Sequence, residues 1–388
     1  MTSTVTPRPR LTALRGQWLF DGTTHRSDAV VVLDGTKIAS IGTVPAGADV
    51  IDLPGTTLLP GLIDTHVHLA FDASPDCVGA LAARDDSEAL AAMDQAARLA
   101  VRAGITTIRD LGDRDYLSLQ LRDRPGLPTI VAAGPPITTP GGHCHYLGGV
   151  TQDVRAAVRE HVERGCDVIK IMASGGTLTP GTRQEDSQFT ALDLRAATEE
   201  AHRHGLPVTA HAHGSQAIAD AIEAGVDGME HVSFWTADGI DDRPDLIKEI
   251  AFRRIAVGAT IGFVPGDGTP PPPAILARMA MFQQTSRRLY EAGAVIVAGT
   301  DAGIGPVKPH NVLPRATTDL LAMGMSPLDA VRTMTSVAAD VVGLAHRKGR
   351  LAAGFDADVL VVDGDPLADP AALQRPRAVY AMGSAVLA

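Results

Sequence analysis

Short apolar runs alternate with Ala-rich amphipathic stretches through the middle of the chain. Runs of this length are typical of buried strands, and the stretches between them are long enough for helices. The alternation predicts eight strands, at Leu59–Val67, Thr106–Leu111, Pro128–Ala132, Val168–Ala173, Pro207–Ala212, Gly228–Val232, Ile255–Thr260 and Ala294–Ala298. The helices predicted between them include Glu88–Ala103 with Ser87 as its N-cap, Val154–Arg164 and Ala191–His204. Eight strands with intervening helices favour an α/β fold of the (β/α)8 TIM barrel type over an open sheet.

The N-terminal part, residues 12–58, has β-type patterning. Ala29–Leu33 is an apolar run, Asp34-Gly35 is a turn signal, and alternation resumes at Lys37–Ile41. This order predicts a β-hairpin.

The C-terminal part, residues 350–388, has similar patterning, with one predicted strand at Asp358–Val362 and another at Arg377–Val386. Each end of the chain is too short to bury a core of its own. We therefore expect residues 1–58 and 350–388 to combine into a small β-sandwich domain beside a barrel formed by residues 59–349.

The charge balance, the apolar runs and the number of cysteines limit the kinds of molecule that the protein is expected to bind. The chain carries 34 Lys and Arg against 45 Asp and Glu, a formal net charge of −11. An acidic chain without a basic run is a poor binder of nucleic acid or anionic membranes, and no apolar run approaches the roughly 20 residues of a membrane span. Three cysteines, Cys77, Cys144 and Cys166, are too few for a disulfide framework. We expect a cytoplasmic protein that binds neither nucleic acid nor membrane.

A proline patch, Pro270–Pro273 within Gly266–Pro273, predicts a loop after the seventh strand.

Histidines are concentrated at one predicted face of the barrel. Of the 13 in the chain, eight lie at or just after the C-terminal ends of predicted strands: His66, His68, His143, His145, His211, His213, His231 and His310. Active sites of barrel enzymes form at this face. The distribution therefore indicates a histidine-rich site there.

His66 and His68 close the first predicted barrel strand, with Asp64 two residues earlier. Residues i and i+2 of a strand point to the same side, so both imidazoles can reach one metal ion. Histidine pairs also occur by chance, but the position after a buried strand makes this pair a candidate metal site.

Lys170 lies inside an apolar strand-like run. A buried, unpaired ammonium costs several kcal/mol, so the side chain either reaches solvent or a carboxylate, or loses its proton. A neutral amine can combine with CO2 to form a carbamate that ligates metal. Taken alone, Lys170 favours the first alternative, a side chain that reaches solvent or a carboxylate.

His211 and His213 follow the fifth predicted strand, His231 the sixth and Asp301 the eighth. Each histidine alone is more often hydrogen-bonded than metal-bound, and Asp301 could be a ligand, a general base or a helix N-cap. Nitrogen and oxygen ligands without cysteine suit Zn²⁺, Mn²⁺ or Fe²⁺.

This order of residues resembles the amidohydrolase superfamily of metal-dependent barrel hydrolases. The resemblance rests on PGLIDTHVHL, GITTIRDLG, IKIMASGG, TAHAHG, EAGVDGMEH and AGTDAG in this order, and on the C-terminal stretch SPLDAVRTMTSVAADVVGL. Within the superfamily the chain is most similar to the group of Xaa-Pro dipeptidases and ochratoxin amidases and, more distantly, to imidazolonepropionase.

The resemblance implies two divalent metal ions, most simply Zn²⁺, and a carbamate on Lys170 that bridges them. One ion would be held by His66, His68 and Asp301, and the other by His211 and His231. We prefer His211 to His213 as a ligand because His211 ends the predicted strand, whereas His213 is expected in the following loop.

The implied reaction is hydrolysis of an amide C–N bond in a dipeptide, an N-acyl amino acid or a related small amide. A hydroxide bridging the metals would attack, and Asp301 would act as base and then as acid. His143 would face and assist the substrate, and His213 and Arg183 are further candidates for substrate binding; His145 and Tyr146 are weaker ones.

Phe189 stands where some dipeptidase relatives carry a substrate-binding tyrosine. A cyclic amide or imide hydrolase, or a metal-binding relative without turnover, are the alternatives. The superfamily also implies a homo-oligomer.

Overall fold

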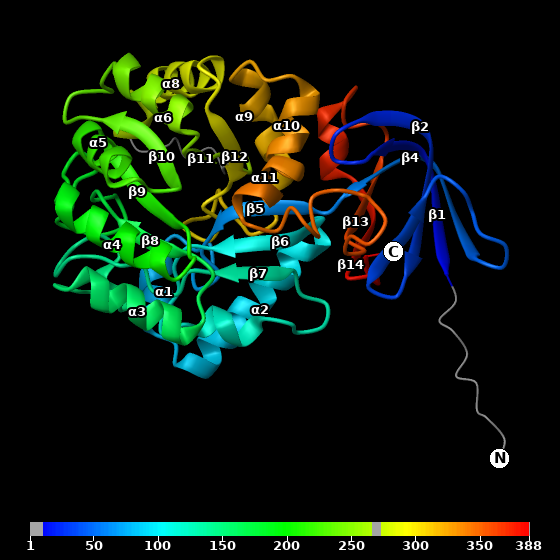
Figure 1. Cartoon of the computed structure of the whole chain (residues 1–388), viewed down its shortest axis with the longest axis horizontal. Helices are drawn as coiled ribbons and strands as arrows, with labels where there is room; N and C mark the ends of the chain where they lie inside the picture. The colour runs from blue at the N-terminus through cyan, green and yellow to red at the C-terminus, as the bar shows by residue number, and fades with distance from the viewer. Residues whose placement is uncertain (1–10, 266–272, 388) are drawn as a thin grey trace.

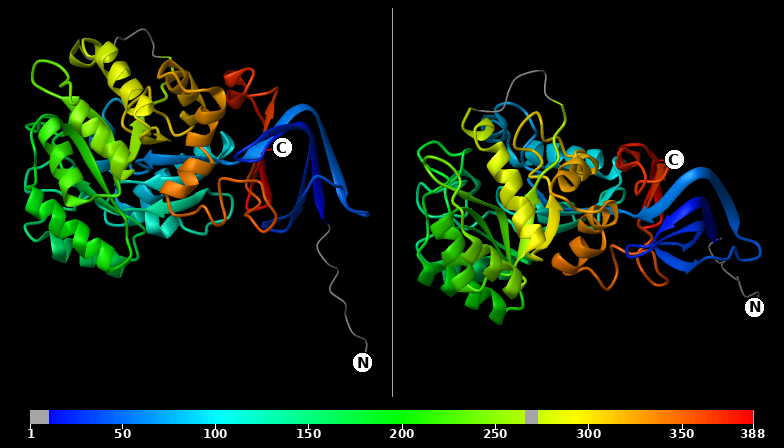
Figure 2. Two further views of the ribbon diagram at one scale, coloured as in Figure 1. Left: turned by 45° about the horizontal axis from the view of Figure 1, so that its top comes forward. Right: turned by 90° about the horizontal axis from the view of Figure 1, so that it is seen from above.

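The computed structural model describes residues 11–265 and 273–387. Parallel strands surrounded by helices occupy one end of the long axis, and a β-rich part occupies the other (Figures 1 and 2).

All eight predicted strands of the middle region are present: β5 Leu62–Val67, β6 Ile105–Asp110, β7 Thr129–Ala132, β8 Ile169–Met172, β9 Val208–Gly214, β10 Gly228–Trp235, β11 Ala256–Thr260 and β12 Val295–Gly299. They form two parallel sheets, in the orders β5-β6-β7 and β12-β11-β10-β9-β8. Isolated bridges join the sheets at both edges, between Val67 and Ala302 and between Ile137 and Ile171. The predicted parallel α/β architecture is confirmed. Closure into a barrel stays a proposal that these two bridges support.

The first predicted strand, Leu59–Val67, is wrong as a single strand. β4 spans Asp49–Pro60 and β5 starts at Leu62, so the break falls at Gly61. A Cβ at Gly61 would overlap the Thr106 side chain on β6, so only glycine allows the chain to cross there.

Helices lie between the strands, and they cover the outer side of the parallel sheets (Figure 1). The α-helices are α1 Cys77–Ala82, α2 Asp86–Arg102, α3 Val154–Arg164, α4 Ala191–Arg203, α5 Ser215–Ala224, α6 Pro244–Arg253, α7 Pro273–Leu276, α8 Met279–Glu291, α9 Ala316–Ala322, α10 Pro327–Thr333 and α11 Ser336–Val341. Short 3-10 helices lie at Leu117–Leu121, His145–Leu147, Leu313–Arg315 and Pro370–Gln374.

The three helices predicted from the sequence are confirmed, but the predicted cap of α2 is wrong. Asp85, not Ser87, is the N-cap, because the Asp85 carboxylate accepts from the Glu88 backbone N–H and the Glu88 carboxylate accepts from that of Asp85. This reciprocal pair is a capping box.

Both ends of the chain contribute to a single seven-stranded sheet, in the order β15-β14-β13-β4-β1-β2-β3. The remaining strands are β1 Thr12–Phe20, β2 His25–Asp34, β3 Lys37–Ile41, β13 Val359–Asp363, β14 Pro376–Ala381 and β15 Ser384–Leu387. The predicted hairpin is confirmed, since Asp34 pairs with Lys37. The predicted strand Arg377–Val386 is wrong as one unit, because a turn at Met382 and Gly383, both with positive φ, divides it into β14 and β15.

The terminal sheet curls around its own core. Lys37 of β3 bridges Asp356, just before β13, although β3 and β13 are far apart in the strand order. Apolar residues of β1 to β4, β13 and β14 share one buried cluster inside this curl. The arrangement agrees with a sandwich-like terminal unit, while its boundaries at residues 58 and 350 stay a prediction.

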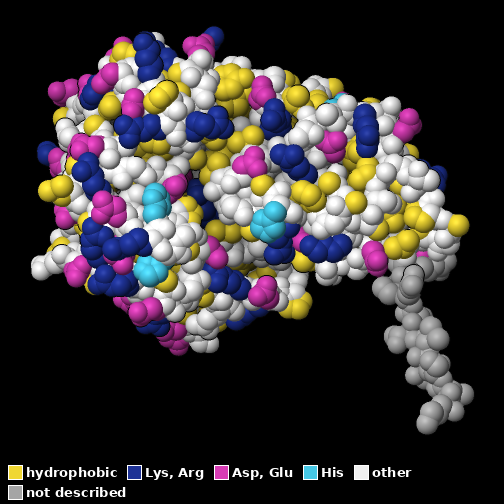
Figure 3. All heavy atoms as spheres, in the orientation of Figure 1, with side chains coloured by type: hydrophobic (Ala, Val, Ile, Leu, Met, Phe, Trp, Pro, Cys, Tyr) yellow, Lys and Arg dark blue, Asp and Glu magenta, His cyan; other side chains and the backbone are white. Residues whose placement is uncertain are grey.

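On the face drawn in Figure 3, acidic and basic side chains are intermingled. Within the described ranges, none of the helices combines the length and apolar character needed to span a bilayer. The predicted loop Gly266–Pro273 falls outside the described residues except for Pro273, which begins α7.

Candidate metal centre

The first group of convergent side chains comprises His66, His68 and Asp301, at the adjoining ends of β5 and β12. The Nε2 atoms of the two histidines are 3.3 Å apart. One Asp301 carboxylate oxygen lies 3.4 Å from Nε2 of His66 and 3.3 Å from Nε2 of His68. Three ligand atoms of the kinds that bind Zn²⁺ or Mn²⁺ therefore face one point.

The other nitrogen of each ring has an acceptor of its own. His66 Nδ1 is 3.0 Å from the Glu230 carboxylate, and His68 Nδ1 is 3.0 Å from the carbonyl oxygen of Gly112. Both acceptors require a proton on Nδ1, which leaves the Nε2 lone pairs free for a metal ion.

Asp64 does not join this group. Its carboxylate accepts from the backbone N–H and the hydroxyl of Thr300, at 3.0 and 2.6 Å. Asp64 therefore ties β5 to the residue that precedes Asp301.

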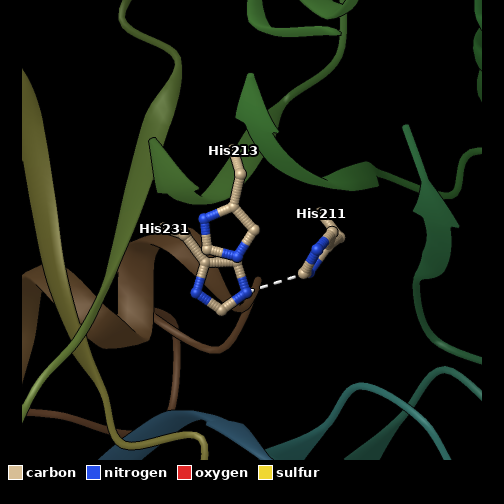
Figure 4. A group of neighbouring side chains, drawn as sticks. All are labelled: His211, His213 and His231. Atoms are coloured by element: carbon tan, nitrogen blue, oxygen red, sulfur yellow. Dashed lines mark hydrogen bonds between the residues drawn. The ribbon is translucent and has the colours of Figure 1, made fainter. Parts of the chain in front are cut away.

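The second group comes from β9 and β10. His211 Nδ1 and His231 Nε2 lie 3.0 Å apart (Figure 4). His211 Nε2 donates to the Gly175 carbonyl oxygen at 3.1 Å, and His231 Nδ1 is 3.0 Å from the Thr260 hydroxyl. As in the first group, the two nitrogens that face each other, His211 Nδ1 and His231 Nε2, are the ones without a protein acceptor.

The expectation that His213 lies in a loop is wrong. It belongs to β9, two residues beyond His211 on the same side of the strand. Its ring stacks on that of His231, with centroids 4.3 Å apart, and its Nδ1 is 2.8 Å from the Ser233 hydroxyl (Figure 4). His211, His213 and His231 each bring one nitrogen within 4.8 Å of the others.

Lys170, on β8, is 1% exposed, and its Nζ has no hydrogen-bond partner among the described residues. It neither reaches solvent nor pairs with a carboxylate, so the reading favoured from the residue alone is wrong. Burial lowers the pKa of Lys170 to about 8, although Glu230 and Asp301 act to raise it. An unpaired, readily deprotonated amine fits a lysine that becomes a carbamate ligand.

Glu230 is the centre of a buried network beneath the first group. Besides the His66 ring, its carboxylate accepts from Arg109 Nη2 at 3.0 Å and from the Thr209 hydroxyl at 2.8 Å. Although burial acts to raise it, His66 and Arg109 hold the pKa of Glu230 well below its usual range. A Cβ at Gly258 on the neighbouring strand would overlap this carboxylate.

The sequence did not direct attention to Glu230 or Arg109. Both are charged residues inside apolar strand runs, which is the same signal that marked Lys170. Their partners lie on other strands, so the network itself could not be predicted.

Two candidate ligands have an unusual backbone. Asp301 has a φ of 59° and His231 a φ of 74°, in the left-handed region that residues with a side chain seldom occupy. Such strain concentrates at functional sites. The N-cap reading of Asp301 is wrong, because no helix begins within ten residues after it.

His143 lies against the second group, with its ring centroid 4.8 Å from that of His211. The ring is buried, and burial lowers the pKa of His143 to about 4, so it is neutral near pH 7. Its Nδ1 is 3.1 Å from the Thr179 hydroxyl, which also accepts from the Cys144 backbone N–H at 2.9 Å.

The remaining candidates lie apart from these contacts. Arg183 is largely exposed, and its guanidinium makes two 2.8 Å hydrogen bonds to Asp186. His145 is exposed and bonds to the carbonyl oxygen of Gly142, and the Tyr146 hydroxyl points to the Cys144 thiol. No described contact joins Arg183, His145 or the buried Phe189 to the facing imidazoles.

The chain is similar to known proteins along most of its length. A model of the amidohydrolase family matches residues 57–386. Ochratoxinase from Aspergillus niger is 30% identical over 363 residues, which cover 83% of this chain and 73% of the relative. Imidazolonepropionase from Rubrobacter xylanophilus is 26% identical over 383 residues, which cover 87% and 85%.

A crystal structure of a Xaa-Pro dipeptidase with methionine in its active site is similar, with a TM-score of 0.83 and 27% identity over 97% of this chain and 99% of the other. The match of the family model to most of the chain, together with these relatives, shows that the chain belongs to the amidohydrolase family.

Proposed function

We propose that the protein is a binuclear metal-dependent hydrolase of amide C–N bonds. The observation that carries the proposal is the pair of facing ligand groups together with an amine, Lys170, that has no partner. His66, His68 and Asp301 would hold one ion, and His211 and His231 the other.

Lys170 would complete the ligand set as a carbamate. The neutral amine forms an N–C bond with CO2 and releases one proton, which leaves an anionic group with two oxygens. Burial favours this step, because it lowers the pKa of the amine to about 8 and so raises the neutral fraction near pH 7. Two oxygens on one group can each serve one ion.

When bound, two divalent ions lower the pKa of a water molecule and polarise a carbonyl group. Asp301 has its carboxylate between His66 and His68 and is mostly buried. Burial acts to raise its pKa, but His66, His68 and Lys308 hold it well below the usual range, so the group is ionised near pH 7. Asp301 would take the proton from the attacking water and then deliver it to the leaving nitrogen.

His143 would donate to the substrate. Because the Thr179 oxygen already accepts from the Cys144 N–H, its own hydroxyl proton is free to bond His143 Nδ1. If Nδ1 accepts from that hydroxyl, the ring proton would sit on Nε2, where it would stabilise negative charge on the carbonyl oxygen.

The substrate class follows by analogy with relatives. Ochratoxinase and a Xaa-Pro dipeptidase with bound methionine are both similar along most of the chain, which supports a small amide formed by an amino acid. Phe189 has no hydroxyl to bind a substrate carboxylate, and the exposed Arg183, which pairs with Asp186, stays a candidate for that contact.

The test is hydrolysis of a panel of N-acyl amino acids, dipeptides and a cyclic imide, with Zn²⁺ or Mn²⁺ added or with chelator. We expect metal-dependent cleavage of at least one linear amide. Cleavage of the imide alone would favour a cyclic amide hydrolase. Two bound metal ions with no turnover on any substrate would favour a metal-binding relative.

A further inference from the structure

Lys308 is a buried cation in the loop after β12. It is 6% exposed, and its Nζ donates to the Thr300 carbonyl oxygen at 2.6 Å and to the Thr260 carbonyl oxygen at 3.0 Å. The ammonium also lies 4.1 Å from the centroid of the Phe263 ring. An ammonium has three N–H donors, so two carbonyl groups and one aromatic face account for all of them.

The two carbonyl groups belong to the C-terminal ends of adjacent strands. Thr300 immediately precedes Asp301, and Thr260 ends β11. The Thr260 hydroxyl is 3.0 Å from His231 Nδ1. One ammonium therefore connects a residue bonded to His231, in the second group, with the residue that leads into Asp301, in the first.

The loop that carries Lys308 folds back on itself. The Gly303 backbone N–H donates to the Lys308 carbonyl oxygen at 2.8 Å, and the Lys308 N–H donates to that of Gly305 at 2.9 Å. Gly303 has a φ of 104°, and a Cβ there would meet the backbone of His68. The loop is thus held against the strand end, which fixes the origin of the lysine side chain.

A second buried lysine shows what is unusual about Lys308. Lys348, 2% exposed, lies 3.1 Å from an Asp356 carboxylate oxygen and 2.5 Å from one of Asp358. Among the described residues, Lys308 has no such carboxylate contact; Asp301, Asp319 and Asp64 act on it only at longer range. A buried charge without a direct counter-ion is costly.

We propose that Lys308 is a positioning residue for both metal ions. Its ammonium fixes the ends of β11 and β12, and through them the Asp301 carboxylate and the His231 ring. This inference rests on the proposed function, since it assigns Lys308 to the same metal centre.

The experiment compares Lys308→Met with Lys348→Met in the full-length protein. Metal-free protein is titrated with Co²⁺, and binding is followed by calorimetry and by the absorption of the bound ion. Thermal unfolding of the metal-free protein is measured in parallel. Lys308→Met removes the charge and keeps a flexible stem, whereas Lys348→Met removes a buried charge whose partners are Asp356 and Asp358 and not the candidate ligands.

We expect Lys308→Met to weaken both equivalents of Co²⁺ by roughly 10- to 100-fold, the usual effect of removing support from metal ligands. Lys308→Arg, which keeps the charge and its donors, should bind with intermediate affinity. Lys348→Met should lower the unfolding temperature and bind Co²⁺ as the parent does.

Parent-like binding of both equivalents by Lys308→Met would overturn the inference. So would an equal loss of affinity in Lys348→Met, because the effect would then follow stability alone. If Lys308→Met does not fold, Lys308→Gln takes its place, and parent-like affinity there would overturn the inference as well. Failure of the parent itself to bind two ions would instead contradict the proposed function.

Discussion

Replacing Glu230 with glutamine tests the buried network beneath the metal centre. Three donors meet the two carboxylate oxygens: His66 Nδ1 on one, and Arg109 and the Thr209 hydroxyl on the other. Glutamine has one oxygen and one NH2 group. Either His66 then faces a donor and loses the acceptor that fixes its tautomer, or Arg109 and Thr209 face that donor instead.

The magnitude follows from which contacts are lost. Removing one partner of a buried charge pair costs about 3–5 kcal/mol, because the Arg109 guanidinium stays buried without a carboxylate. Loss of the acceptor behind a metal-bound histidine costs roughly 10- to 100-fold in metal affinity. We therefore expect Glu230→Gln to lower the free energy of unfolding of the metal-free protein by the first amount. We also expect it to weaken metal binding by the second.

The assay is urea unfolding of the metal-free protein together with calorimetric titration with Zn²⁺. Glu223→Gln is the control, because Glu223 forms an exposed pair with Arg195, and such pairs contribute less than about 1 kcal/mol. A Glu230→Gln variant that unfolds and binds Zn²⁺ like the parent would refute the role given to this network.

Three further outcomes are expected. Lys170→Ala and Lys170→Arg should both lose activity and metal, since a guanidinium stays protonated and cannot form a carbamate; near-normal turnover of Lys170→Arg would exclude the bridging role. Asp301→Asn should lose about 10²–10⁴ in kcat while keeping its fold and at least one metal ion, and a kcat close to the parent's would remove the proposed proton carrier. The metal-free protein should lose stability as the pH falls from about 6.5 to 4. Burial lowers the pKa of His310 to about 4, so the unfolded chain binds a proton in this window that the folded chain does not. Between pH 7 and pH 5 this amounts to on the order of 2 kcal/mol. Urea unfolding of His310→Gln should show a smaller difference between these two pH values, and an unchanged difference would argue against a buried neutral His310.

Regular elements could be predicted from the sequence because apolar runs and helical periodicity are local. The predictions failed at single positions that contacts decide. The break at Gly61 reflects a close approach to Thr106 on another strand. The N-cap of α2 could have been predicted from the sequence, since Asp85 and Glu88 have the spacing of a capping box.

The candidate ligands could be predicted because they lie on parallel strands or directly after them, and such strands bring their C-terminal parts to one face. The residues that support them could not, since the roles of Glu230, Arg109 and Lys308 depend on which side chains meet across strands. Arg183 as a substrate contact stays a prediction, and its exposed guanidinium is hydrogen-bonded to the neighbouring Asp186.

The most direct test of the account is the number of metal ions bound to each chain in active protein. The two facing groups around Lys170 predict two equivalents of a divalent ion, with activity that is lost on chelation and restored only as the second equivalent is added. Full activity with one equivalent, unchanged by further metal, would contradict the binuclear centre.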